Sequence, residues 1–210
     1  LVGSEMCIRD RPLPFKLAKQ IFNSIYQKID GISISLNERE AKNIKSKEFV
    51  YGEIEFDSFL ELIKKIKPKK DDIFYDLGSG TGKPCIAVGL TYKIKSVIGY
   101  ELLENLWKTS NEILAKLKSI VENLPSIQFI QGNFLEKDFS DASIIFGHLS
   151  CLEDFTMSKL EDKFKLLKTG TRIILITKKL ESAEDFKLVE EGEVKMSWGI
   201  ATYRIYKKTS

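Results

Sequence analysis

The sequence of 210 residues predicts an α/β fold with five parallel strands, a C-terminal antiparallel hairpin and helices on both faces of the sheet. Three observations support this. From residue 72 onward, short apolar runs alternate with longer stretches of helical periodicity, which is typical of a parallel sheet with helical crossovers. A glycine-rich segment follows the first run directly. The last two runs are separated by only a few residues, which suits a hairpin.

The individual elements follow from run length and periodicity. We expect parallel strands at 73–77, 96–100, 127–130, 143–146 and 172–177. We expect helices around 83–91, 102–121 and 154–168, and hairpin strands around 188–196 and 201–207, which Trp198-Gly199-Ile200 would connect.

The N-terminal third has a different pattern. Apolar residues at helical spacing predict a helix over 14–28 and a second over 56–66 that ends before Pro68. Residues 31–48 are polar, so we expect a loop with one short helix. We expect a non-native or disordered tail over 1–12, because its sequence resembles a translated sequencing adaptor. A helical segment and lid would follow over 13–70, and a cofactor-binding domain over 71–210.

Composition excludes several classes of protein. The chain is 43% hydrophobic and 30% charged, and its net charge of +3 is too small to imply nucleic-acid binding by itself. Three cysteines without a CxxC pair and a single histidine favour neither a disulfide scaffold nor a metal site. No apolar run approaches the roughly 20 residues of a membrane helix. The basic run over 64–70 is interpreted as a solvated helix end.

The glycine-rich segment 76–82, DLGSGTG, lies between the first strand and the next helix, where open α/β sheets bind ligands. A dinucleotide fingerprint would need a third glycine at the position of Lys83, and a P-loop would need glycine at Leu77 and Ser or Thr at Pro84. The remaining spacing suits S-adenosyl-L-methionine, with Asp76 facing the methionine ammonium. The alternative is a tight turn without a ligand.

Two further strand ends support the same cofactor. Glu101 ends the second strand 21 residues after Gly80, about where an acidic residue meets ribose hydroxyls; alternatively it is a solvated carboxylate at a helix start. After the third strand, Asn133 could read the adenine amino group and Phe134 could stack on the ring, or Phe134 could belong to the core. The expected cofactor-binding residues are therefore Asp76, Gly78, Gly80, Gly82, Lys83, Glu101, Asn133 and Phe134.

Five segments, in order along the chain, resemble one known family. They are FVYGEIEFDSFLELI at 49–63, FYDLGSG at 74–80, IGYE at 98–101, GNFL at 132–135, and MSW at 196–198 followed by Thr202-Tyr203. Together they resemble the Dot-type (disruptor of telomeric silencing) histone-lysine methyltransferases over roughly residues 49 to 206.

The resemblance implies a seven-strand Rossmann-like methyltransferase sheet under a short helical lid, with S-adenosyl-L-methionine as cofactor. It implies that Tyr51 and Glu53 help to bind this cofactor and that Tyr203 walls the channel for the acceptor. One departure concerns Gly147-His148-Leu149, because the family carries Asn-Asn-Phe there. His148 could hydrogen-bond the incoming amine or act as a base.

The predicted function is thus S-adenosylmethionine-dependent N-methylation of lysine in a protein. The expected acceptor is a core histone or nucleosome, so nucleic acid would be met only through chromatin, in the nucleus or cytoplasm and without a membrane. The alternative is a methyltransferase for a non-histone protein or small molecule with His148 as base. A third hypothesis is a non-catalytic scaffold that binds the cofactor.

Overall fold

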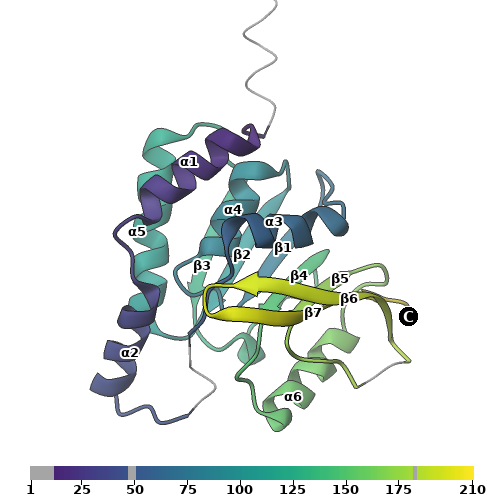
Figure 1. The fold of residues 1–210 in the computed structure, drawn as a ribbon. Helices are drawn as coiled ribbons and strands as arrows, with labels where there is room; N and C mark the ends of the chain where they lie inside the picture. The colour runs from purple at the N-terminus through teal and green to yellow at the C-terminus, as the bar shows by residue number, and fades with distance from the viewer. Residues whose placement is uncertain (1–11, 47–50, 182–183) are drawn as a thin grey trace, which may run out of the picture.

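The structure is a computed structural model that describes residues 12–46, 51–181 and 184–210 (Figure 1). Residues 1–11 of the expected tail, and Phe49 and Val50 of the segment at 49–63 that resembles the Dot-type family, lie outside the described residues. The strands are β1 (Ile73–Leu77), β2 (Ser96–Glu101), β3 (Ser126–Gln131), β4 (Ile144–His148), β5 (Arg172–Ile176), β6 (Phe186–Met196) and β7 (Gly199–Lys208).

These strands form one sheet in the order β3-β2-β1-β4-β5-β7-β6. The first five are parallel, and β7 pairs antiparallel with both β5 and β6. The predicted fold class is confirmed. The strand order reverses between β1 and β4, and the loops after these strands therefore diverge and leave room for a ligand. The turn of the hairpin is Ser197-Trp198, because Met196 already pairs with Gly199.

Helices cover both faces of the sheet (Figure 1). They are α1 (Phe15–Tyr26), α2 (Gly31–Ala41), α3 (Phe56–Lys65), α4 (Lys83–Thr91), α5 (Glu104–Ile120) and α6 (Asp154–Lys165), and a short 3-10 helix, η2, spans Phe134–Glu136. Helices α1, α3, α4 and α5 share one apolar core with the sheet, and α6 shares the other.

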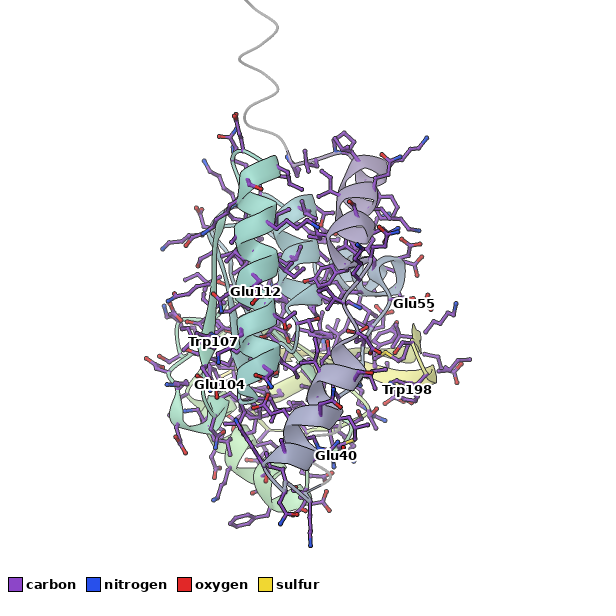
Figure 2. All side chains as sticks on the ribbon, turned by 90° about the vertical axis from the view of Figure 1, so that its left-hand side faces the viewer. Glu40, Glu55, Glu104, Trp107, Glu112 and Trp198 are labelled. Carbon is purple, nitrogen blue, oxygen red and sulfur yellow. The ribbon has the colours of Figure 1, made fainter. Side chains whose placement is uncertain are left out.

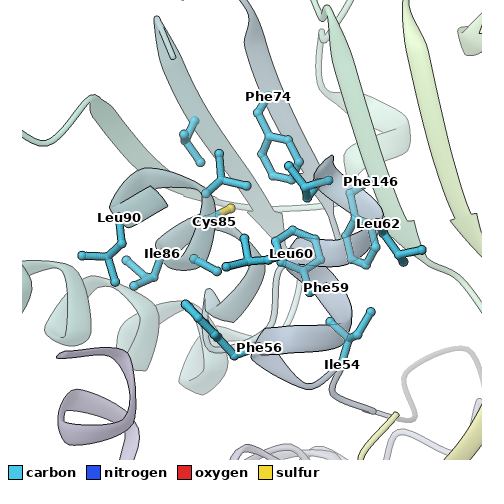
Figure 3. Close-up of a cluster of buried hydrophobic side chains, with 14 of the residues drawn as sticks. Ile54, Phe56, Phe59, Leu60, Leu62, Phe74, Cys85, Ile86, Leu90 and Phe146 are labelled. Atoms are coloured by element: carbon cyan, nitrogen blue, oxygen red, sulfur yellow. The ribbon is translucent and has the colours of Figure 1, made fainter. Parts of the chain in front are cut away.

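The alternation of side chains along β4 explains this division. Ile144 and Phe146 point into the core under α3 and α4, whereas Ile145 points into the core under α6. In the first core the ring of Phe59 from α3 packs edge-on against Phe146 at 5.0 Å between centroids (Figure 3). Alternation with period two places every second residue on the same face.

The N-terminal helices pack against the helices that follow the glycine loop. Helix α1 contacts α4 and α5, and α2 contacts α5 (Figure 2). The predicted helix over 14–28 is confirmed, whereas the polar stretch after it forms a full 11-residue helix, α2, where mainly loop was expected. Helix α2 has few buried apolar residues, because the buried carboxylate of Glu38 joins it to α5 through hydrogen bonds.

The described residues contain no candidate for a membrane-spanning helix or for a metal site. None of their helices combines the length and apolarity that crossing a bilayer requires. Among the same residues no group of three or more His, Cys, Asp or Glu side chains is arranged to hold a metal ion.

Candidate functional site

The glycine loop between β1 and α4 has the backbone that its sequence predicts. Gly78, Gly80 and Gly82 all have positive φ, at 87°, 56° and 86°. Gly80 is also required by space, since a Cβ there would lie 2.1 Å from Cε2 of Tyr51. The ring of Tyr51 therefore packs directly on the loop, and only glycine permits this approach.

Glu101 links the end of β2 to this loop. Its carboxylate accepts a hydrogen bond from the Gly80 N–H at 2.7 Å and one from the Leu103 N–H at 2.8 Å. Burial raises its pKa, although these backbone hydrogen bonds act in the opposite direction. Glu101 thus holds the loop in place and still presents free lone pairs, since a carboxylate has about four acceptor positions.

Asp76 lies beneath the loop and is 1% exposed. Its one described partner is the Cys85 thiol, with Sγ 3.8 Å from Oδ2, and no cationic side chain of the described residues forms an ion pair with it. Burial and the nearby Glu101 raise the pKa of Asp76 well above its usual value. Two buried carboxylates without a cation fit a positively charged ligand, because opposite charge offsets the cost of burial.

A cavity of about 340 Å³ opens beside these groups, at the carboxyl ends of β1, β2 and β4. Six of the predicted site residues line it: Tyr51, Gly78, Glu101, Asn133, Phe134 and His148. Five of the predicted cofactor-binding residues do not line the cavity: Asp76, Gly80 and Gly82 of the glycine-rich segment, and Lys83 and Glu53 beside it. A volume of this size lies in the usual range for small-molecule sites.

Sequence reasoning missed the apolar wall of the cavity. Leu102, Leu103 and Leu106 follow Glu101 and line the cavity, as does Leu135, the neighbour of Phe134 in sequence. Such a wall suits a flat heterocycle. The sequence could have indicated this wall, because two leucines directly follow the acidic residue that ends β2. The expected adenine contact of Asn133 stays a prediction, and its Oδ1 already accepts the Leu135 N–H at 3.0 Å.

A short strap, defined here as residues 51–54, crosses the glycine loop. The Tyr51 hydroxyl donates to Glu53 at 2.9 Å and lies 3.1 Å from the Thr81 hydroxyl. The other Glu53 oxygen forms an ion pair with Lys83, and both side chains are more than four-fifths buried. Burial raises the pKa of Tyr51 well above its ordinary value. The strap therefore joins predicted site residues that are 30 positions apart.

His148 ends β4, and both of its ring nitrogens are engaged. Nδ1 lies 3.1 Å from the Gly52 carbonyl oxygen and Nε2 lies 3.0 Å from the Ser150 hydroxyl. Because a carbonyl can only accept, Nδ1 carries a hydrogen, and neutral Nε2 accepts from Ser150. Burial lowers the pKa of His148 below 6.5. The imidazole is thus neutral and satisfied at physiological pH.

Tyr203 lies apart from the cavity. It sits on β7 in the core under α3, is 5% exposed, and donates its hydroxyl hydrogen to Glu190 at 2.6 Å. The side chain faces Lys65 of α3, whose Nζ is 5.9 Å from the ring centroid. This placement offers no support for the expected role in a channel wall, because the hydroxyl is turned to the hairpin and α3.

A family model described as histone methylation protein DOT1 matches residues 32–203. A protein-lysine N-methyltransferase of Saccharolobus islandicus is 33% identical over 115 residues, which are 54% of this chain and 66% of that protein.

An H3 lysine-79-specific histone-lysine N-methyltransferase of Kluyveromyces lactis is 35% identical over 136 residues. These residues are 60% of this chain but only 24% of the yeast protein. The chain therefore spans a part of these curated relatives and not their whole length.

Among solved structures, an RNA methyltransferase from Salinibacter ruber in complex with S-adenosyl-L-homocysteine superposes with a TM-score of 0.56. The match covers 74% of this chain and 90% of that one at 22% sequence identity. At this identity the likeness establishes the Rossmann-like methyltransferase fold.

Proposed function

The chain belongs to the DOT1 family of histone methylation proteins, and from this membership we propose that it is an S-adenosylmethionine-dependent protein-lysine N-methyltransferase. The observation that carries the proposal is the pair of buried carboxylates, Asp76 and Glu101, around the glycine loop beside an apolar cavity. S-Adenosylmethionine carries an ammonium and a sulfonium, and its methyl group is the electrophile of the reaction. Its two cationic centres suit the buried carboxylates, and its adenine suits the apolar wall of the cavity.

Each part of the site has a proposed task. Asp76 faces the ammonium, and Glu101 receives the ribose hydroxyls while it fixes Gly80 and Leu103. Phe134 and the leucines after Glu101 hold the adenine. Tyr51 and Glu53 cover the amino-acid end from the strap. These residues bind and orient, and positioning accounts for much of the acceleration in a displacement of this kind.

The acceptor amine must lose its proton before it can react. Lysine has a pKa of about 10.4 in water, so deprotonation at pH 7 costs roughly 4.6 kcal/mol. Transfer into an apolar site lowers that pKa, which removes the need for a strong protein base. His148 is consistent with this, because burial lowers its pKa and both ring nitrogens are already hydrogen-bonded within the protein.

The finer part of the proposal is the acceptor. We propose a lysine of a protein, with a core histone as the first candidate because the Kluyveromyces lactis relative is a histone-lysine enzyme. The archaeal relative is described as a protein-lysine enzyme without mention of histones, so a non-histone protein is the second candidate. A nuclear location would follow from the first candidate only.

The test is transfer of a labelled methyl group from S-adenosylmethionine to separate acceptors: nucleosomes, free histones, protein extract and RNA. We expect label in protein, recovered as methyl-lysine after hydrolysis, and none with Asp76→Asn. Label in RNA, or in a low-molecular-weight fraction alone, would contradict the proposal. The RNA arm is needed because the structural neighbour from Salinibacter ruber is an RNA methyltransferase.

A further inference from the structure

One of the two described hydrogen bonds of His148 joins it to the main chain of the strap. The Nδ1–H donates to the Gly52 carbonyl at 3.1 Å, across 96 positions of sequence. Both residues line the cavity beside Tyr51. A group at the end of β4 therefore holds the segment that covers the glycine loop.

Gly52 is enclosed on two sides. A Cβ at this position would lie 2.8 Å from Cε1 of His148 and 3.0 Å from Nε1 of Trp198. The two rings are nearly parallel, at 14°, with centroids 6.4 Å apart. Real Cβ atoms essentially never come within 3.0 Å of a side chain, so any residue larger than glycine here would displace the imidazole and press on the indole.

The same strap is tied to the β6–β7 hairpin next to this slot. The Ser197 N–H donates to the Glu53 carbonyl at 3.0 Å, and Ile54 forms a bridge with Met196. At its other end, Tyr51 rests on Gly80. The strap therefore has anchors on the glycine loop and on the hairpin, and His148 supplies a further one between them.

We infer that His148 is a positioning residue, which fixes the main chain of Gly52 between its own ring and Trp198 and so holds the strap over the cofactor end of the cavity. The inference deepens the proposed function and rests on it for the choice of ligand. It assigns His148 to retention of the cofactor and not to proton transfer. To hold Gly52, a residue at position 148 needs a hydrogen-bond donor where Nδ1 lies.

The central experiment measures binding of S-adenosylhomocysteine by calorimetry for wild type, His148→Ala and His148→Asn. Loss of one hydrogen bond predicts affinity weaker by about 3- to 10-fold for His148→Ala. His148→Asn should stay within about twofold of wild type, because an Asn amide nitrogen can donate from nearly the position of Nδ1. Ser150→Ala is the matched control, since it removes the partner of Nε2 and leaves the Gly52 contact, and its affinity should be unchanged.

A second measurement needs no ligand. Trp198 is one of two tryptophans, so in a Trp107→Phe background it is the only fluorophore of its kind. Acrylamide should quench Trp198 more strongly after His148→Ala than in wild type or His148→Asn, because the stacked slot has opened. Thermal unfolding of each variant separates this local change from loss of the fold.

The outcomes that would overturn this inference differ from the one that would overturn the proposed function. Unchanged affinity and unchanged quenching in a folded His148→Ala variant would overturn the inference, as would equal losses in His148→Ala and His148→Asn. Failure of the wild type to bind S-adenosylhomocysteine would instead overturn the proposed function. The quenching comparison would then still decide whether His148 holds the strap.

Discussion

At the scale of single residues, Asp76 shows how a binding site differs from a well-packed core. A carboxylate that is 1% exposed and has no cationic partner among the described residues destabilises the ligand-free fold. The raised pKa of Asp76 has a definite consequence for stability. The unfolded chain ionises first as pH rises through the usual range for Asp, so stability falls with rising pH until the folded-state pKa is reached.

Asp76→Asn should therefore have opposite effects on stability and binding. The ligand-free variant should be at least as stable as wild type at pH 7, because a neutral amide replaces a buried acid. Its affinity for S-adenosylhomocysteine should fall by about 10- to 150-fold, the loss expected for one charged hydrogen bond of about 1.5–3 kcal/mol. Calorimetry and thermal unfolding measure the two effects, with the exposed Asp71→Asn as control. An unchanged affinity would remove Asp76 from the site.

His148 gives a prediction about pH. Burial lowers the pKa of His148 below 6.5, so the imidazole is already neutral above that pH. The methylation rate should rise toward the pKa of the acceptor amine without an inflection near 6.5, and His148→Asn should retain the profile. A general base would instead contribute a factor of about 10²–10⁴, and both the rate and an inflection would vanish together in the variant. Methylation rates of wild type and His148→Asn, measured from about pH 5.5 to about pH 9.5, distinguish these cases.

How far the site was predictable depends on the residue. The glycines and Glu101 could be placed from sequence, because loop dihedrals and strand ends leave a local pattern. The contact of His148 with Gly52 could not, because it joins positions 96 apart through a main-chain carbonyl that has no side-chain signature. Tyr203 was expected near the cavity from resemblance alone, and the alternation of β7 turns it toward α3.

At the scale of elements, the start of α5 depends on another helix. Leu103 occupies its N-cap position and supplies no side-chain hydrogen bond. Glu38 of α2 does so instead, accepting from the Glu104 and Asn105 N–H groups at 2.9 and 2.7 Å. Burial opposes ionisation of Glu38, but hydrogen bonds from Lys42 and these two amides outweigh it, and its pKa is lowered. A carboxylate at a helix N-terminus also complements the dipole.

Glu38→Ala should remove the charged acceptor of two part-buried N–H groups at the start of α5 and cost about 1–3 kcal/mol of stability. At about 2–4 °C per kcal/mol for a chain of this size, the melting temperature should fall by about 2–12 °C. Glu40→Ala, on the exposed face of the same helix (Figure 2), is the matched control and should change little. The difference between wild type and variant should shrink as pH falls through the lowered pKa of Glu38, since protonation removes the same contribution. A constant difference down to acid pH would contradict this role.

The contact between Glu38 and the start of α5 explains why the sequence predicted mainly a loop where α2 forms. A polar helix is recognisable when its apolar residues repeat, but α2 buries Ser35 and Glu38 instead. The stability that a buried carboxylate contributes depends on the backbone amides that it accepts from, and here those belong to α5. Strands β1 and β2, by contrast, were predictable to within a residue, because continuous apolar runs between helices require no knowledge of a distant partner.

At the scale of the whole molecule, ligand binding and folding are linked. A ligand that binds only the folded state at 100 times its dissociation constant adds about 2.7 kcal/mol to the free energy of unfolding. S-Adenosylhomocysteine at that ratio should therefore raise the melting temperature by about 5–11 °C. The shift should be clearly smaller for Asp76→Asn at the same ligand concentration. No shift in a folded wild-type protein would contradict the cofactor assignment.

The place of β7 in the sheet has a consequence for the route by which the chain folds. β7 lies between β5 and β6, although it follows both in sequence. A hairpin with a two-residue turn closes in about 1–10 μs, far faster than strands distant in sequence find each other. The β6–β7 pair should therefore assemble first and dock as a unit on β5. Substitutions at the hairpin turn should then slow folding at least as much as equally destabilising ones at the β5–β7 seam, such as Ile205→Ala, because the turn is already formed when the hairpin docks.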